Sequence, residues 1–159
     1  MNWYLKCLKE YANFKGRASR SEYWFFVLFN ILFSIAAGMI DRTLGLTGSI
    51  GVGTLYSLAM FIPGLAVATR RFHDTGRSGL QIVICYVAVF VGAMMMGVGA
   101  VAGIISAGNE SAGGAAAGGM FALLGMALMA AAGIYALVIL VLGSTPGDNK
   151  YGPPAPSAP

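Results

Sequence analysis

The sequence has few charged residues and few of the side chains that usually carry chemistry. Aspartate, glutamate, lysine and arginine make up 10% of its 159 residues, whereas soluble domains carry about 25%. So few charges cannot cover a soluble surface, which excludes an ordinary soluble domain. There is one histidine, His73, and there are two cysteines, Cys7 and Cys85. None of these has the spacing of a metal site or of a disulfide framework, so we predict two free thiols, no metal and no other cofactor.

What the sequence has instead is four long apolar runs that contain no charged residue and no histidine. They cover residues 23–40, 51–69, 79–105 and 120–142. A membrane-spanning helix needs about 20 mostly apolar residues. We therefore predict an all-α integral membrane protein with a four-helix transmembrane bundle. The alternative is three spans and a re-entrant segment, because Pro63 and Gly64 interrupt the second run.

The basic residues lie between the runs, and their distribution predicts the orientation of the chain. Residues 1–22 carry five lysines and arginines, the loop at 70–78 carries three and residues 143–159 carry one. With four spans these three segments share one side of the membrane, and the loops on the opposite side carry a single basic residue, Arg42. By the positive-inside rule both termini are then cytoplasmic. We predict three regions: a leader of residues 1–22, a membrane domain of residues 23–142, and a tail of residues 143–159 whose end is disordered.

The leader has the pattern of a short amphipathic helix. The residues that share its apolar face are Trp3, Tyr4, Cys7, Leu8 and Tyr11. We predict that this helix lies at the interface on the cytoplasmic membrane surface, with its aromatic rings at headgroup depth. The alternative is a cytoplasmic cap that packs on the bundle.

Residues 19–22 fit a capping box at the start of the first span. Ser19 is the expected N-cap, and Glu22 is expected to reach back to it. The alternative is a phosphate site at the helix N-terminus, where an anion is held by Lys15, Arg17, Ser19 and Arg20. A carboxylate in the same turn disfavours an anion, so we predict the cap.

Residues 70–79, RRFHDTGRSG, concentrate polar side chains between two apolar runs. Arginines complement the dipole at a helix C-terminus and mark the membrane boundary, which explains their charge. Their composition also fits an anion or a lipid headgroup, because the planar guanidinium matches phosphate. Catalysis by His73 is a weaker third interpretation, since no orienting partner has suitable spacing. The candidate residues for contact with an anion, a lipid or a partner protein are Arg17, Arg20, Arg70, Arg71, His73, Asp74, Arg77, Ser78, Asn149 and Lys150.

Packing between the spans is expected to depend on small residues. Gly99 and Gly103 form a GxxxG pair in the third run, and such pairs let two helices approach closely in lipid. A helix face of this kind also suits self-association of the protein into a homo-oligomer. No run carries an ionisable acid, base or histidine, which disfavours an ion-coupled transporter.

Three segments resemble the motifs of a known family. They are FKGRASRSEYWFFVLFN (14–30), PGLAVATRRFHDTGRSG (63–79) and PGDNKYGP (146–153). In this order they are similar to the domain-of-unknown-function 805 family of small bacterial inner-membrane proteins. The resemblance implies an inner-membrane protein, it implies no activity, and it suggests that the three motifs work together on the cytoplasmic side.

These observations predict an accessory or scaffold protein that is not an enzyme. Its cytoplasmic basic motifs are expected to contact anionic lipid or a partner protein. Nucleic acid is not an expected partner, because the basic residues lie at the ends of apolar runs. The alternatives are a small oligomeric transporter or channel and, less favoured, an enzyme that acts on lipid headgroups.

Overall fold

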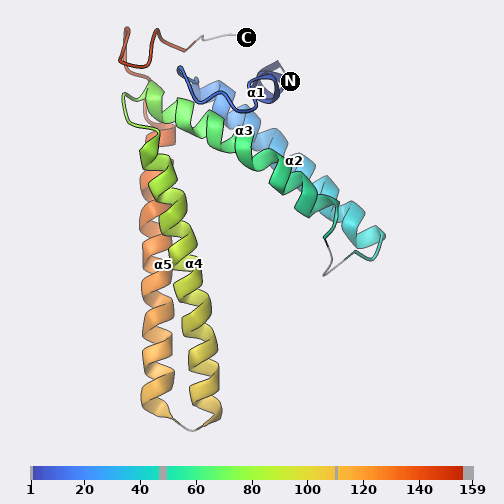
Figure 1. The fold of residues 1–159 in the computed structure, drawn as a ribbon, viewed down its shortest axis with the longest axis vertical. Coiled ribbons are helices and arrows are strands. Elements are labelled where there is room, and N and C mark those ends of the chain that lie inside the picture. Colours follow the sequence, from blue (N-terminus) through green and yellow to red (C-terminus); the bar gives the residue numbers. More distant parts are fainter. Residues whose placement is uncertain (1, 47–49, 110, 156–159) are drawn as a thin grey trace. The chain divides into compact units, whose positions relative to one another are not determined.

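The computed structural model describes residues 2–46, 50–109 and 111–155, and its regular elements in this part of the chain are helices. They are α1 (Asn2–Lys9), α2 (Arg20–Thr43), α3 (Val52–Asp74), α4 (Leu80–Gly108) and α5 (Ala112–Val141) (Figure 1). The helices α2 to α5 are each long and apolar enough to cross a membrane, which confirms the four predicted spans. The alternative with a re-entrant segment does not hold, because α3 runs unbroken through Pro63.

The chain divides into two compact units. The first contains residues 1–79 and 140–159, and the second contains residues 80–139. In the first unit α2 and α3 lie side by side and α1 packs against both (Figure 1). The second unit is a hairpin of α4 and α5 (Figure 1). The segment after α5 thus belongs to the same unit as the leader and the first two spans.

The apolar face of α1 forms part of the core of the first unit. Trp3, Tyr4 and Cys7 are buried. The Tyr4 ring stacks on Phe26 of α2 with ring centroids 5.6 Å apart, and its hydroxyl lies 3.3 Å from the Tyr56 hydroxyl of α3. The predicted amphipathic helix is therefore present, and its apolar face packs on α2 and α3.

The start of α2 confirms one half of the predicted capping box. Ser19 is the N-cap, and its hydroxyl oxygen accepts a hydrogen bond from the Glu22 backbone N–H over 3.2 Å. The other half is wrong, because the Glu22 carboxylate is bound by Lys6 and Arg70 instead of reaching back to Ser19. Two cations attract a carboxylate more strongly than a neutral N–H does.

Glycines hold the hairpin of the second unit together. A Cβ atom on Gly99 of α4 would lie 2.6 Å from the Gly118 carbonyl oxygen of α5, so only a residue without a side chain fits there. Gly118 is equally close to Gly103. The predicted GxxxG pair thus faces a helix of its own chain. Helix α5 begins at Ala112, ahead of the predicted span at 120–142, because these glycines pack closely and alanine favours helix.

Candidate functional site

Charged residues from the first two sequence motifs meet in the first unit, and they are buried. The charged residues with 6% or less of their surface exposed are Arg17, Glu22, Arg70, Arg71 and Asp74. A buried charge is costly unless an opposite charge or a hydrogen bond compensates it. The partners of these five residues therefore decide what the site does.

Asp74, at the end of α3, is the centre of one ionic cluster. Its Oδ1 accepts a hydrogen bond from Arg17 Nε over 2.8 Å. Arg71, one turn earlier on α3, donates to the other carboxylate oxygen, and the Ser144 hydroxyl donates to the same oxygen over 2.5 Å. The side chains of all three charged residues are fully buried. One carboxylate therefore joins the segment before α2, the end of α3 and the segment after α5.

Arg17 also fixes the segment after α5. Its Nη1 donates to the Gly147 carbonyl and its Nη2 donates to the Thr145 carbonyl, each over 2.7 Å. The Thr145 hydroxyl in turn donates to the Asp74 carbonyl over 2.9 Å. The predicted disordered end of the tail extends into residues 156–159, which lie outside the described residues.

His73 is held between the leader and the tail. Its Nδ1 lies 3.2 Å from the Gly16 carbonyl oxygen, and its ring stacks on Tyr151 with centroids 3.7 Å apart and planes 6° from parallel. Asn149 Nδ2 donates to the His73 carbonyl over 2.9 Å, and the Lys150 ammonium lies 5.0 Å from the centre of the Tyr151 ring. These contacts of His73 all lie within the chain.

Arg70 is the centre of a second ionic cluster. Its Nη1 donates to Glu22 over 2.6 Å and to Glu10 over 2.5 Å. Lys6 Nζ donates to the second Glu22 oxygen over 2.7 Å, so one carboxylate joins α1, α2 and α3. The Cys7 thiol lies 3.8 Å from Glu22, and burial, followed by the Glu22 charge, raises the pKa of that thiol to about 12. Among the described residues, Nε and Nη2 of Arg70 have no hydrogen-bond partner.

The ten candidate residues fall into two groups. Those buried or half-buried in contacts within the chain are Arg17, Arg70, Arg71, His73, Asp74 and Asn149. Those exposed to solvent are Arg20, Arg77, Ser78 and Lys150. Binding of an external anion by the first group stays a prediction, and the geometry shows that carboxylates of the chain itself already lie on its three arginines.

The sequence pattern missed the partners of Arg70. Glu10 was not singled out, and Glu22 was interpreted as a cap, yet both bind Arg70. Ser144 was missed for Asp74. The small number of acidic residues could have indicated these ion pairs, because six acids in the whole chain leave few partners for each arginine. In the described ranges no group of three histidine, cysteine or acidic residues is placed to hold a metal ion.

Comparison with known proteins identifies the family of this chain. Residues 11–153 match the model of a family described as a protein of unknown function, DUF805. The chain belongs to the DUF805 family. It is 42% identical over 99 residues to the inner membrane protein YhaH of Escherichia coli K12, and 44% identical over 96 residues to YhaI of the same strain. These matches cover 60% of this chain and 81% and 80% of the two relatives.

The DUF805 match includes all three segments that meet at the site, since it begins before residue 14 and ends at residue 153. The family resemblance expected from these segments is thus confirmed. No solved structure matches the chain significantly. Together with four helices able to cross a bilayer, the relatives make this DUF805 member an integral inner-membrane protein whose family has no established activity.

Proposed function

We propose that this DUF805 protein is a non-catalytic accessory or scaffold protein that presents a cytoplasmic platform to anionic phospholipid. The platform comprises residues 2–22, 70–79 and 143–155. The observation that carries the proposal is the pair of buried ionic clusters, around Asp74 and Arg70, that fasten these three segments to one another. A platform fixed in this way presents its remaining surface charges in a constant arrangement.

The remaining surface of the platform is basic. Its exposed cations are Lys9, Lys15, Arg20, Arg77 and Lys150. Of its four acids, Glu10, Glu22 and Asp74 are bound in ion pairs, which leaves Asp148 as the one outside the clusters. A basic residue near an anionic membrane surface contributes about 1 kcal/mol of attraction. This imbalance supports contact between the platform and anionic lipid.

The groups that could support catalysis are committed to structural contacts. His73 is stacked on Tyr151 and bonded to backbone. The Asp74 carboxylate accepts from two arginines and a serine. The Cys7 thiol, with a raised pKa, carries little of the nucleophilic thiolate near neutral pH. These commitments favour binding over catalysis.

Native mass spectrometry of the detergent-solubilised protein tests the lipid proposal. The protein is incubated with equal amounts of phosphatidylglycerol and phosphatidylcholine, and the retained lipid is identified from the mass of the complex. We expect preferential retention of phosphatidylglycerol and a reduced preference in a Lys9→Gln/Lys15→Gln/Lys150→Gln variant. Equal retention of both lipids by the unaltered protein contradicts the proposal and turns the search to protein partners.

The cytoplasmic orientation has its own test. A Lys150→Cys substitution is made in a chain without the natural cysteines, by Cys7→Ser and Cys85→Ser, so that one thiol reports the side of the tail. A membrane-impermeant maleimide is expected to label it in inverted vesicles and to leave it unlabelled in intact spheroplasts. The reverse pattern places the platform on the periplasmic side and contradicts the proposal.

A further inference from the structure

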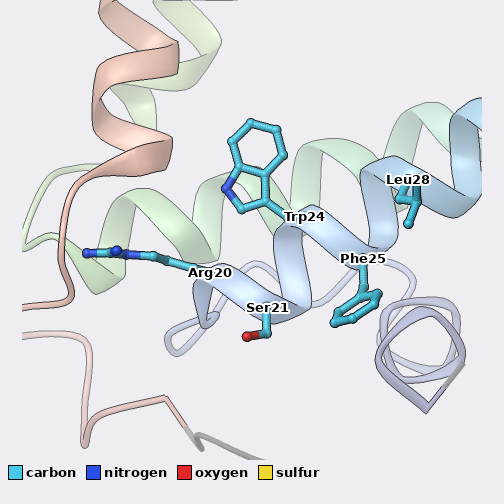
Figure 2. Close-up of a pocket in the computed structure, with 5 residues that line it drawn as sticks. All are labelled: Arg20, Ser21, Trp24, Phe25 and Leu28. Atoms are coloured by element: carbon cyan, nitrogen blue, oxygen red, sulfur yellow. The ribbon is translucent and has the colours of Figure 1, made fainter.

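A groove lies on one face of α2, at the start of that helix. It has a volume of about 330 Å³ and is lined by Arg20, Ser21, Trp24, Phe25 and Leu28 (Figure 2). These positions recur at helical spacing on one face. That face is polar in the first turn and apolar beyond it, and its three apolar side chains are 39–49% exposed. On a membrane-spanning helix, such a face meets lipid.

Arg20 differs from the arginines of the clusters. Arg17, Arg70 and Arg71 are buried and each binds a carboxylate. Arg20 is exposed, and within the described part of the chain no carboxylate pairs with it. Its Nε donates to the Leu142 carbonyl over 3.0 Å, which holds the guanidinium at the start of α2 and leaves its terminal nitrogens for a further acceptor.

The contact with the backbone after α5 also sets the position of this guanidinium. A Cβ atom on Gly143 would lie 3.0 Å from Arg20 Nη2, so the glycine leaves the room in which the guanidinium lies. Figure 2 shows Arg20 extended from the first turn of α2 toward this segment. A planar guanidinium held at one end is preorganised to bind two oxygens of a phosphate.

The acid in the same turn does not oppose an anion here. Glu22 is fully buried, and its two oxygens are bound by Lys6 and Arg70. Its charge is therefore compensated on the opposite face of α2. Glu22 was expected to disfavour an anion beside Arg20, but its ion pairs with Lys6 and Arg70 leave it no free charge to repel one.

The depth of the groove fits the upper part of a phospholipid. Arg20 is the first residue of a helix that can cross the membrane, so it lies at headgroup level. Trp24 follows one turn deeper, where amphipathic rings favour the interface. The rise of about 1.5 Å per residue puts Leu28 about 12 Å below Arg20. A phosphate at one end and the first part of an acyl chain along the rest occupy such a length.

We propose that this groove is a binding site for an anionic phospholipid. Arg20 and the Ser21 hydroxyl bind the phosphate, and an acyl chain lies along Trp24, Phe25 and Leu28. This inference rests on the proposed function, because it names the place where the basic platform holds its lipid. It requires a specific site in addition to the general attraction of the exposed lysines.

Fluorescence of Trp24 tests the site directly. Trp3 and Trp24 are the two tryptophans of the chain, so a Trp3→Phe variant reports from the groove. The variant is reconstituted in phosphatidylcholine vesicles that contain a small fraction of brominated phosphatidylglycerol or, in parallel, brominated phosphatidylcholine. We expect stronger quenching by the anionic lipid. Arg20→Gln should lower its apparent affinity about fivefold, the effect of one basic residue at an anionic surface.

Arg42→Gln is the matched control, because it removes the same charge from the exposed last turn of the same helix. It should leave the quenching unchanged, whereas Gly143→Ala should weaken it by displacing the Arg20 guanidinium without loss of charge. If Trp3→Phe fails to fold, native mass spectrometry replaces the fluorescence measurement. It compares the phosphatidylglycerol retained by Arg20→Gln with that retained by the unaltered protein.

The outcomes separate this inference from the proposed function. Preference for phosphatidylglycerol that survives Arg20→Gln and is lost with the lysines of the platform overturns the groove site and leaves the platform proposal standing. No preference in the unaltered protein overturns both. Loss of preference in Arg20→Gln with Arg42→Gln unaffected supports both.

Discussion

Each of the two units of this chain is stabilised internally by a different kind of contact. In the first unit, ion pairs join residues that are far apart in the sequence, such as Arg17 with Asp74 and Arg70 with Glu22. In the second, neighbouring helices α4 and α5 approach through glycines, with Gly99 against Gly118. The first kind of contact needs a particular chemical partner, whereas the second needs only the absence of a side chain.

This difference has a physical cause. Lipid tails are as apolar as the helix surfaces, so burial of apolar area gives helices in a membrane little reason to choose one neighbour over another. A hairpin has its neighbour fixed by a short connection, and close packing is enough. A leader, two helices and a tail must be brought together from across the sequence, and charged groups that are costly to leave unpaired select that arrangement. The clusters thus specify the fold of the first unit.

The largest expected effect comes from breaking the Asp74 cluster. Asp74→Asn leaves Arg17 and Arg71 as buried charges without a carboxylate, and we expect a loss of about 3–5 kcal/mol in the free energy of unfolding. Unfolding by dodecyl sulfate in mixed micelles measures it. Asp148→Asn is the control, since this acid is exposed and the change should stay within about 0.5 kcal/mol. Equal effects of the two substitutions would show that the cluster does not hold the unit.

A smaller effect is expected from the second unit. The Cβ atom added by Gly99→Ala would meet the backbone of α5 at 2.6 Å, and forcing the helices apart should cost about 1–3 kcal/mol. Gly97→Ala on the same helix is the control. Its Cβ meets no atom within 4 Å, and alanine favours helix, so we expect no loss or a slight gain. The same unfolding assay compares them, and a more harmful Gly97→Ala would mean that the hairpin packs through another face.

The N-cap of α2 offers a third, still smaller effect in the first unit. Ser19→Ala removes the acceptor for the Glu22 backbone N–H and should cost about 1 kcal/mol. Ser34→Ala, at an exposed position of the same helix, should be close to neutral. Thermal unfolding followed by circular dichroism distinguishes them. A neutral Ser19→Ala would mean that the ion pairs of Glu22 alone fix the start of α2.

The features that sequence reasoning predicted are local ones. The four spans follow from apolar runs, and the Ser19 cap follows from residues three positions apart. The Arg70–Glu22 pair could not be predicted in this way, because 48 positions separate its residues and other acids were available to Arg70. The charge of residues 70–79 pointed to a membrane boundary. The sequence alone did not show that these charged side chains form ion pairs with distant residues of the same chain.

The start of α5 was missed for a related reason. Glycine and alanine add little hydropathy and glycine disfavours helix, so residues 112–119 did not extend the predicted span. Their role depends on the neighbour against which they pack, and here Gly118 lies on Gly99 and Gly103. A contact of this kind is a property of two helices together, which a reading of one segment cannot supply.

Cysteine labelling, for which the smallest effect is expected, reports on one unit at a time. Cys7 lies in the first unit and Cys85 in the second. In a Cys85→Ser background, the Cys7 thiol, whose pKa is raised to about 12 from 9.0, should have about a thousandfold less thiolate than an ordinary thiol and should react correspondingly slowly with a maleimide at pH 8.

Asp74→Asn should accelerate this labelling if it loosens the first unit as a whole, whereas Gly99→Ala should leave it unchanged because it acts on the second unit. The sign of the pH dependence follows from the raised pKa. The stabilising contribution of the neutral thiol is complete below about pH 9 and is lost as the pH rises toward about 12. Labelling is therefore measured at pH 8, where the thiol does not itself destabilise the fold. Rapid labelling in the unaltered first unit would contradict its burial, and equal acceleration by both substitutions would show that the two units do not unfold separately.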